Sequence, residues 1–148
     1  MRLTIFTDYT LRILIYLGIH RHESRLTTIS NIATAYGISE NHLMKIVQHL
    51  AKLGYVETKR GKGGGMRLAR APEKILLGDV VRDAEDDLAI VQCFQKNYTA
   101  CPIESTCALA EILRRAMSAF FDELDGHTLA DLLEPRDKLI AAFRKNSA

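Results

Sequence analysis

The sequence predicts a mainly helical protein with one small β-hairpin, namely a winged helix-turn-helix followed by a long C-terminal dimerisation helix. Three observations predict this fold class. Two short amphipathic segments flank a turn at Gly37, which is the pattern of a helix-turn-helix. A glycine-rich run at 61–65 then separates two segments of strand composition. Further along, residues 107–125 have a wide apolar face at helical spacing.

The first 53 residues predict three helices. Residues 4–19 form the first, and Thr27-Thr28 can cap a second over 29–36. Ser39 follows the Gly37 turn and caps a third helix that runs to about Leu53. The apolar face expected for the first helix consists of Ile5, Leu11, Leu14, Ile15 and Leu17.

The third helix leads into the predicted wing. Residues 55–60 have strand composition, 61–65 form a glycine-rich turn, and 66–69 return as a second strand. A hairpin attached to a helix-turn-helix is a winged helix, and Pro72 ends it. We therefore expect residues 1–72 to form the first domain.

Residues 73–134 are expected to form a second part, and 135–148 a flexible tail. A helix is predicted over 77–87, an irregular loop over 92–107, and a long helix to Asp125. Thr128 and Asp131 predict a capping box for a last short helix. The apolar face of the long helix is wide enough to need a partner helix, so we assign the dimer contact to Leu109, Ile112, Leu113, Ala116, Met117, Phe120 and Leu124.

Composition limits where the protein works. Its 148 residues suit one domain, or a small domain with an extension. No apolar run is long enough to span a bilayer, and the N-terminus lacks a signal-peptide layout. We therefore expect a cytoplasmic protein without a membrane partner, in a compartment where thiols stay reduced.

The small net charge hides an asymmetry between the two halves. Residues 1–71 carry 11 Lys and Arg against 4 Asp and Glu, a balance of +7, whereas residues 72–148 carry 9 against 14, a balance of −5. A basic half beside an acidic half suggests a polyanion binder with a separate second function. An ordinary uneven surface is the plain alternative.

The third helix has the side chains of a DNA-recognition helix. With Leu43 on the core side, helical spacing turns four positions away from the core, and none of them is acidic: Asn41, Lys45, Gln48 and Lys52. Asn and Gln pair with adenine, Lys contacts guanine or phosphate, and the N-terminal end of the helix reaches base edges first. A solvated helix face is the alternative. The residues predicted to contact DNA from this region are Thr28, Ser39, Asn41, His42, Lys45, Gln48 and Lys52.

The wing adds cations around flexible glycines. Glycine lets the backbone approach a phosphate closely, and Arg60, Lys62 and Arg67 would neutralise it. A nucleotide-binding loop is the alternative, but the run 61–65 lacks Walker spacing and does not open a helix.

The three cysteines of the chain lie within 15 positions. Cys93, Cys101 and Cys107 have the spacing C-x7-C-x5-C, between polar residues. In a reducing compartment such a cluster favours a metal over a disulfide. Three thiolates suit an iron–sulfur cluster or zinc with a fourth ligand from elsewhere, and a thiol redox switch stays open.

Together these motifs resemble the Rrf2 family of iron–sulfur transcription regulators. The resemblance covers about residues 1–134 and rests on four segments. These are Met1-Arg2-Leu3-Thr4-x-Phe6-Thr7-Asp8-Tyr9, Ser39-x-Asn41-His42-Leu43-x-Lys45, Arg60-Gly61-x-x-Gly64-Gly65-x-x-Leu68 and the cysteine loop. It implies a winged-helix homodimer that binds double-stranded operator DNA, with Cys93, Cys101 and Cys107 holding the cluster.

Branches of this family differ at positions that can be checked. IscR-like regulators have a ligand His where this chain has Ala110, and another branch has a His where it has Arg12. RirA-like iron regulators share the cysteine spacing but usually have Asn in place of Asp8. In the nitric-oxide-sensing branch this Asp, from the partner subunit, is the fourth ligand of a 4Fe–4S cluster. A surface ion pair with Arg12, four residues on, is the alternative role of Asp8.

The resemblance thus implies a transcriptional repressor, not an enzyme, that senses nitric oxide through an iron–sulfur cluster and leaves DNA when the cluster is nitrosylated. We expect a 4Fe–4S cluster, with 2Fe–2S as the alternative. An iron- or cluster-sensing regulator of the same family, RirA-like or IscR-like, is one other hypothesis. A thiol-redox protein or iron–sulfur carrier is the other, although no C-x-x-C motif is present.

Overall fold

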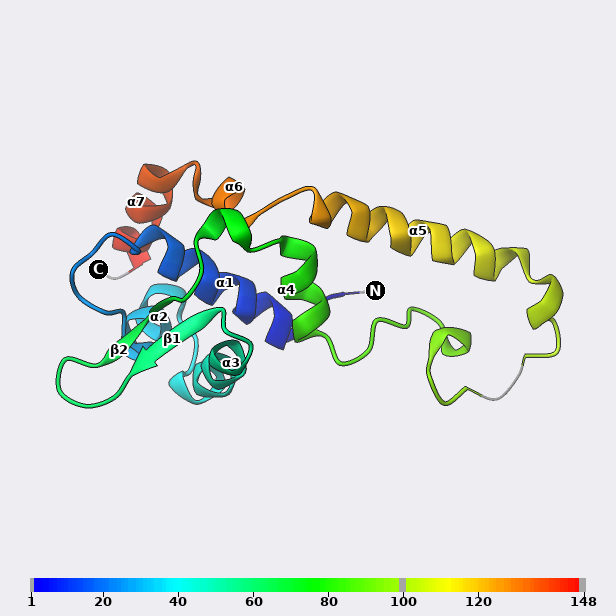
Figure 1. Ribbon diagram of the computed structural model, residues 1–148, viewed down its shortest axis with the longest axis horizontal. Coiled ribbons are helices and arrows are strands. Elements are labelled where there is room, and N and C mark those ends of the chain that lie inside the picture. The colour runs from blue at the N-terminus through cyan, green and yellow to red at the C-terminus, as the bar shows by residue number, and fades with distance from the viewer. Residues whose placement is uncertain (1, 99–100, 147–148) are drawn as a thin grey trace.

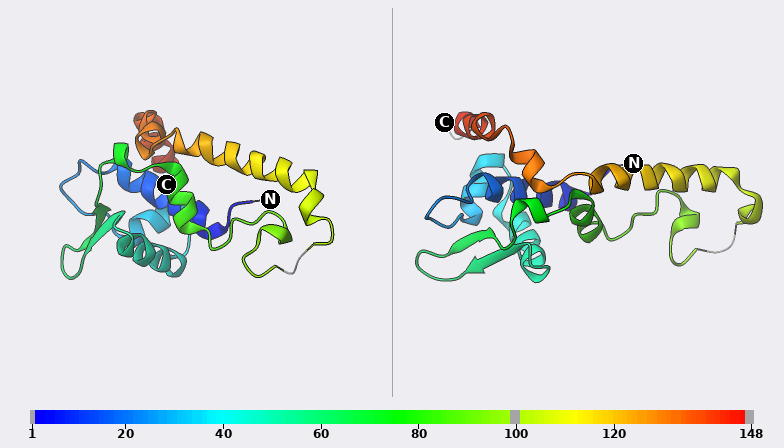
Figure 2. Two further views of the ribbon diagram at one scale, coloured as in Figure 1. Left: turned by 45° about the vertical axis from the view of Figure 1, so that its right-hand side comes forward. Right: turned by 45° about the horizontal axis from the view of Figure 1, so that its top comes forward.

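The computed structural model describes residues 2–98 and 101–146, and its element order follows the sequence prediction closely. A winged-helix domain lies at one end of the molecule, and a single long helix, α5 (Ala108–Asp125), projects from it as an arm (Figure 1). The loop that contains the cysteines returns beside this arm in all three views (Figures 1 and 2).

Local capping signals set the first three helices. Thr4 caps α1 (Ile5–Ile19), where its hydroxyl accepts a hydrogen bond from the Thr7 backbone N–H. Thr28 caps α2 (Ile29–Tyr36) in a capping box, and Ser39 caps α3 (Glu40–Lys52). Gly37 ends α2 with φ of 66°, a left-handed conformation that suits glycine.

The core lies between these helices and the base of the hairpin. Ile13, Leu14, Ile32 and Leu43 are fully buried, and Tyr55 is 2% exposed where the chain enters the hairpin. The face predicted for α1 was wrong at its first residue, because Ile5 is 67% exposed. Ile5 lies on the outer side of the first turn, whereas its neighbour Phe6 packs against the core.

The wing is an antiparallel hairpin of β1 (Val56–Lys59) and β2 (Gly65–Leu68), in which Glu57 pairs with Arg67. The segment before α2 adds a short bridge that the sequence did not reveal. Thr27 exchanges two backbone hydrogen bonds with Met66, at N···O distances of 2.7 and 3.1 Å. The wing is therefore fixed to the segment before α2 near its turn, where Met66 pairs with Thr58.

After the turn η1 (Pro72–Lys74), α4 (Leu77–Ala84) joins the domain to the arm. The helix predicted over 77–87 ends earlier, at Ala84. Arg82 of α4 makes a bidentate ion pair with Asp125 at the end of α5, at 2.8 and 2.6 Å. Gly78 allows this approach, because a Cβ atom there would lie 1.8 Å from the Asp125 carboxylate.

The C-terminal segment is more regular than we predicted. Thr128 and Asp131 form the expected capping box at the start of α6 (Leu129–Leu133). Where we expected a flexible tail, the structure has helix α7 (Arg136–Asn146). Arg136 donates two hydrogen bonds to the Ile19 carbonyl, and Phe143 packs edge-on against the rings of Tyr16 and Tyr36. These contacts hold α7 against α1 and α2.

Candidate DNA-binding surface and cysteine loop

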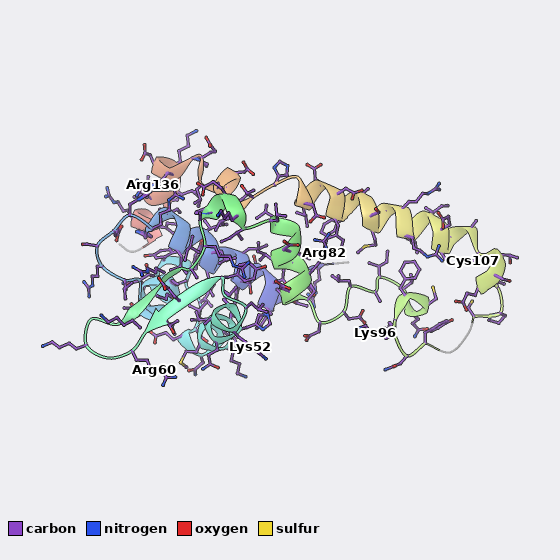
Figure 3. The ribbon with its side chains drawn as sticks, viewed as in Figure 1. Lys52, Arg60, Arg82, Lys96, Cys107 and Arg136 are labelled. Atoms are coloured by element: carbon purple, nitrogen blue, oxygen red, sulfur yellow. The ribbon has the colours of Figure 1, made fainter. Side chains whose placement is uncertain are left out.

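Helix α3 has the two faces that the sequence predicted. Leu43, Ile46, Val47 and Leu50 are buried, which leaves the opposite side of the helix free. The exposed residues on that side include Asn41, His42, Lys45, Gln48 and Lys52. Lys52 of α3 and Arg60 of the wing lie along the same lower edge of the molecule (Figure 3). One face therefore combines exposed polar side chains with cations.

The two predicted hydroxyl contacts, Thr28 and Ser39, are engaged in capping. The Thr28 hydroxyl accepts from the Asn31 N–H at 3.2 Å, and that of Ser39 accepts from the His42 N–H at 3.4 Å. Both residues thereby orient the N-terminal turns of α2 and α3, where backbone N–H groups favour a phosphate.

The cations of the wing differ in their surroundings. Arg60 and Lys62 are exposed, whereas Arg67 makes an ion pair with Glu57 across the hairpin. Lys59 of the wing and Arg25, a cation that sequence reasoning missed, line a hollow between the 24–26 segment and the wing. The Thr27–Met66 bridge joins these segments, and no local signal predicts that bridge.

The predicted ligand Asp8 lies in the first turns of α1 and is engaged with Arg12. Its carboxylate accepts from the Arg12 guanidinium at 3.0 and 2.9 Å, and both side chains are nearly half exposed. The guanidinium also lies over the rings of Tyr9 and Tyr36. Burial raises the pKa of Tyr36 to about 12, against the lowering effect of Arg12. Within one subunit, Asp8 is thus an exposed carboxylate with a partner that water can replace.

The cysteines lie in the loop between α4 and α5, far from the winged-helix domain. Cys93 is in the turn η2 (Gln92–Phe94), Cys101 precedes the turn η3 (Glu104–Thr106), and Cys107 directly precedes α5 at the tip of the arm (Figure 3). All three are free and half-buried. Among the described residues, no three His, Cys, Asp or Glu side chains are gathered closely enough to hold a metal ion.

The chemistry of this donor set nevertheless fits an iron–sulfur cluster. Three reduced thiols on one largely irregular loop can supply three thiolates, and none is committed to a disulfide. Two aromatic residues flank them, which sequence reasoning missed. Arg114 of α5 lies 5.6 Å from the Phe94 ring. The pKa of Tyr98 is raised by burial and by a hydrogen bond to Cys101.

The residues predicted for dimerisation lie along the arm and are incompletely covered. Ala110 is the buried residue of α5, whereas Leu109 is 61% and Ile112 is 52% exposed. Ala116 is exposed, and Leu113, Met117, Phe120 and Leu124 are half-buried. Met117 and Phe120 line a groove of about 420 Å³ with Leu3, Leu88 and Ile90. One chain alone therefore does not cover this face.

Helices long and apolar enough to cross a membrane do not occur in the part of the chain that the structure describes.

Comparison with known proteins agrees with a winged-helix regulator. Residues 3–135 match the Rrf2 family, described as iron-dependent transcriptional regulators. The T. potens IscR structure superposes with a TM-score of 0.73 at 26% identity, covering 90% of this chain and 87% of that one. CymR, the global cysteine regulator of B. subtilis, gives 0.69 at 28% identity, covering 89% and 95%. The chain belongs to the Rrf2 family and is a transcriptional regulator, not an enzyme.

Within the family, the chain is similar to regulators named NsrR. It is 47% identical to the HTH-type transcriptional regulator NsrR of Bacillus subtilis over 144 residues, 97% of this chain and 98% of that regulator. It is 48% identical to NsrR of Geobacillus kaustophilus over 145 residues, 98% of each.

Proposed function

We propose that the protein is a homodimeric repressor that binds operator DNA and senses nitric oxide through an iron–sulfur cluster. The observation that carries this proposal is the placement of the chain's three cysteines. They are free thiols on one loop at the tip of an arm whose apolar face is left uncovered. Pairing of two arms would bring each loop beside a second copy, which can supply a further ligand.

Cys93, Cys101 and Cys107 of one subunit and Asp8 of the other would hold the cluster. When bound, it supplies iron that nitric oxide can attack. A carboxylate is a hard ligand among soft thiolates, and so it is the donor most easily exchanged. Arg12 can hold the same carboxylate at 2.9 Å. Asp8 therefore has two alternative partners, and the choice between them would set the position of α1.

The DNA side of the proposal rests on charge and exposure. Residues 1–71 have a balance of +7, and the exposed faces of α3 and the wing carry Lys45, Lys52, Arg60 and Lys62. Such a surface favours phosphate contacts, while Asn41 and Gln48 can read bases. The protein would act in the cytoplasm, where its thiols stay reduced.

Anaerobic titration with nitric oxide tests the sensor, following visible absorbance and operator binding. We expect Asp8→Ala to keep a cluster on the three thiolates but to change its reaction rate and weaken its effect on DNA binding. Asp8→Cys should give a four-thiolate site that reacts more slowly. Arg12→Gln is the matched control, because it removes the ion pair and keeps the carboxylate. If Asp8→Ala equals the wild type or only reproduces Arg12→Gln, Asp8 is a surface partner of Arg12 and not a ligand.

An iron- or cluster-sensing regulator is the second candidate, favoured by the family's description as iron-dependent. Iron chelation without nitric oxide distinguishes the two. A release of DNA under chelation, with a slow or absent response to nitric oxide, would favour the iron sensor.

A further inference from the structure

The end of α4 is the point where the cysteine loop begins, and it is bonded to three parts of the DNA-binding domain. Asp83 contacts both α3 and the start of the wing: its carbonyl oxygen is 2.8 Å from His49 Nε2, and its carboxylate accepts from the Tyr55 hydroxyl at 2.6 Å. Glu85, two residues on, accepts from the Thr4 N–H at 2.7 Å and from the Thr7 hydroxyl at 2.6 Å. A shift of this segment must therefore strain bonds to α1, α3 and the wing.

His49 receives contacts from two of these directions. A carbonyl oxygen only accepts hydrogen bonds, so Nε2 of His49 carries the proton and donates to Asp83. The Phe6 ring of α1 meets the His49 ring edge-on, at a centroid distance of 5.3 Å. Phe6 is two residues from Asp8. The same imidazole thus touches the Asp8-bearing turn and the entrance to the cysteine loop.

The position of His49 on α3 connects it to the DNA-facing side. Lys45 and Lys52 lie four residues before it and three residues after it, on the neighbouring turns of the same helix face. Both are exposed and belong to the proposed phosphate-contacting set. In the part of the chain that the structure describes, His49 is the α3 side chain that is hydrogen-bonded to α4. A displacement transmitted to His49 would therefore tilt these lysines relative to DNA.

We infer that His49 is the positioning residue through which the state of the cysteine loop sets the orientation of the recognition helix. The inference rests on the proposed function and identifies its route. The ring contact of His49 with Phe6 couples it to the position of α1, and its hydrogen bond to Asp83 couples it to the position of α4. A residue that only packed the two helices would affect stability, whereas a positioning residue affects the difference in DNA affinity between two states of the protein.

Two substitutions separate the contacts. His49→Phe keeps a ring against Phe6 and loses the donor, whereas His49→Gln keeps an N–H donor for the Asp83 carbonyl and loses the ring. Phe6→Leu removes the ring contact from the other side and should reproduce His49→Gln. Lys52→Ala is the control, because removal of a phosphate-binding cation should weaken DNA binding in every state alike.

The experiment measures operator Kd for the full-length dimer, both loaded with cluster and stripped of it, and melting of the stripped protein checks folding. We expect a wild-type affinity ratio between the two states of about fivefold or more, the usual scale of allosteric coupling. Both His49 variants should reduce this ratio, and Lys52→Ala should lower both affinities and preserve it. A reduced ratio in only one variant would assign the coupling to the contact that this variant lacks.

One result would overturn the inference alone, namely His49 variants that keep the wild-type ratio, whether their two affinities are unchanged or weakened by the same factor. A wild-type ratio near one is a different failure, because it would overturn the proposed function and with it the role of His49.

Discussion

The winged-helix domain and the arm bury their apolar side chains very differently. In the domain, Ile13, Leu14, Ile32 and Leu43 are completely inaccessible to solvent, and each buried side chain of this size contributes about 1.5–3 kcal/mol. In the arm, Leu109 and Ile112 are more than half exposed. One chain is therefore sufficient to bury the core of the DNA-binding domain, whereas the apolar face of the arm needs a second surface to cover it.

The same two regions differ in how their polar groups are held. Threonine and serine caps, a backbone bridge at Thr27 and the Asp83 contacts hold the domain together. The cysteine loop has two short turns, and its thiols have no disulfide partner. A well-ordered winged-helix domain beside a less regular loop suits a regulator, because a change at the loop can shift the domain as a whole between two states.

The largest expected effect is loss of the cluster when a cysteine of the loop is replaced, with no effect on the winged-helix domain. Cys93→Ala, Cys101→Ala and Cys107→Ala should each abolish or badly destabilise the cluster, because no neighbouring thiol can replace the one removed. Iron and sulfide content with visible absorbance measure this, and the melting of the winged-helix domain should not change. Ser105→Ala, in the same loop, is the control and should keep full iron content. A cysteine variant that retains all its iron would remove that residue from the ligand set.

The next effect concerns the arm. Leu113→Asp or Phe120→Asp places a charge in the proposed seam, where burial without a partner costs several kcal/mol. We expect the dimer to dissociate about a hundredfold more readily or worse, measured by sedimentation. Arg115→Asp puts the same carboxylate on the opposite side of the helix and should leave the dimer intact. Unchanged dimers in all three variants would reject α5 as the seam.

Local signals in the sequence predicted most of the elements, and long-range contacts explain what they missed. The caps at Thr28, Ser39 and Thr128 are recognised within four residues, and each was found where expected. Helix α7 was missed because its contacts, such as Arg136 with the Ile19 carbonyl, join segments 117 residues apart.

In the candidate site, too, local patterns could be predicted from the sequence and long-range contacts could not. The exposed face of α3 follows from helical periodicity, so its side chains could be assigned in advance. Cysteine spacing predicts three donors on one loop but not their separation, because the loop between them has little regular structure. The contacts of His49 with Phe6 and Asp83 depend on the packing of three helices, and no local pattern indicates them.

The smallest effects distinguish two kinds of residue within the DNA-binding face. Lys62 lies at the exposed tip of the wing and Asn41 near the start of α3. Lys62→Ala should weaken binding to all sequences alike and reduce the slope of log affinity against log salt by about one for each phosphate that is no longer neutralised. Asn41→Ala should cost about 1–3 kcal/mol on the operator, because it removes a paired hydrogen bond to a base.

Binding to the operator and to unrelated duplexes, each at several salt concentrations, separates these outcomes. Asn41→Ala should flatten the preference for particular bases and keep the salt slope, because it changes no charge. Lys62→Gln is the matched control for Lys62→Ala, since both remove the charge and only one shortens the side chain. Equal reductions in affinity for these two variants would assign the effect to charge. A wild-type affinity independent of salt would contradict phosphate contact by this face, and the exposed lysines of α3 and the wing would then be ordinary solvated side chains.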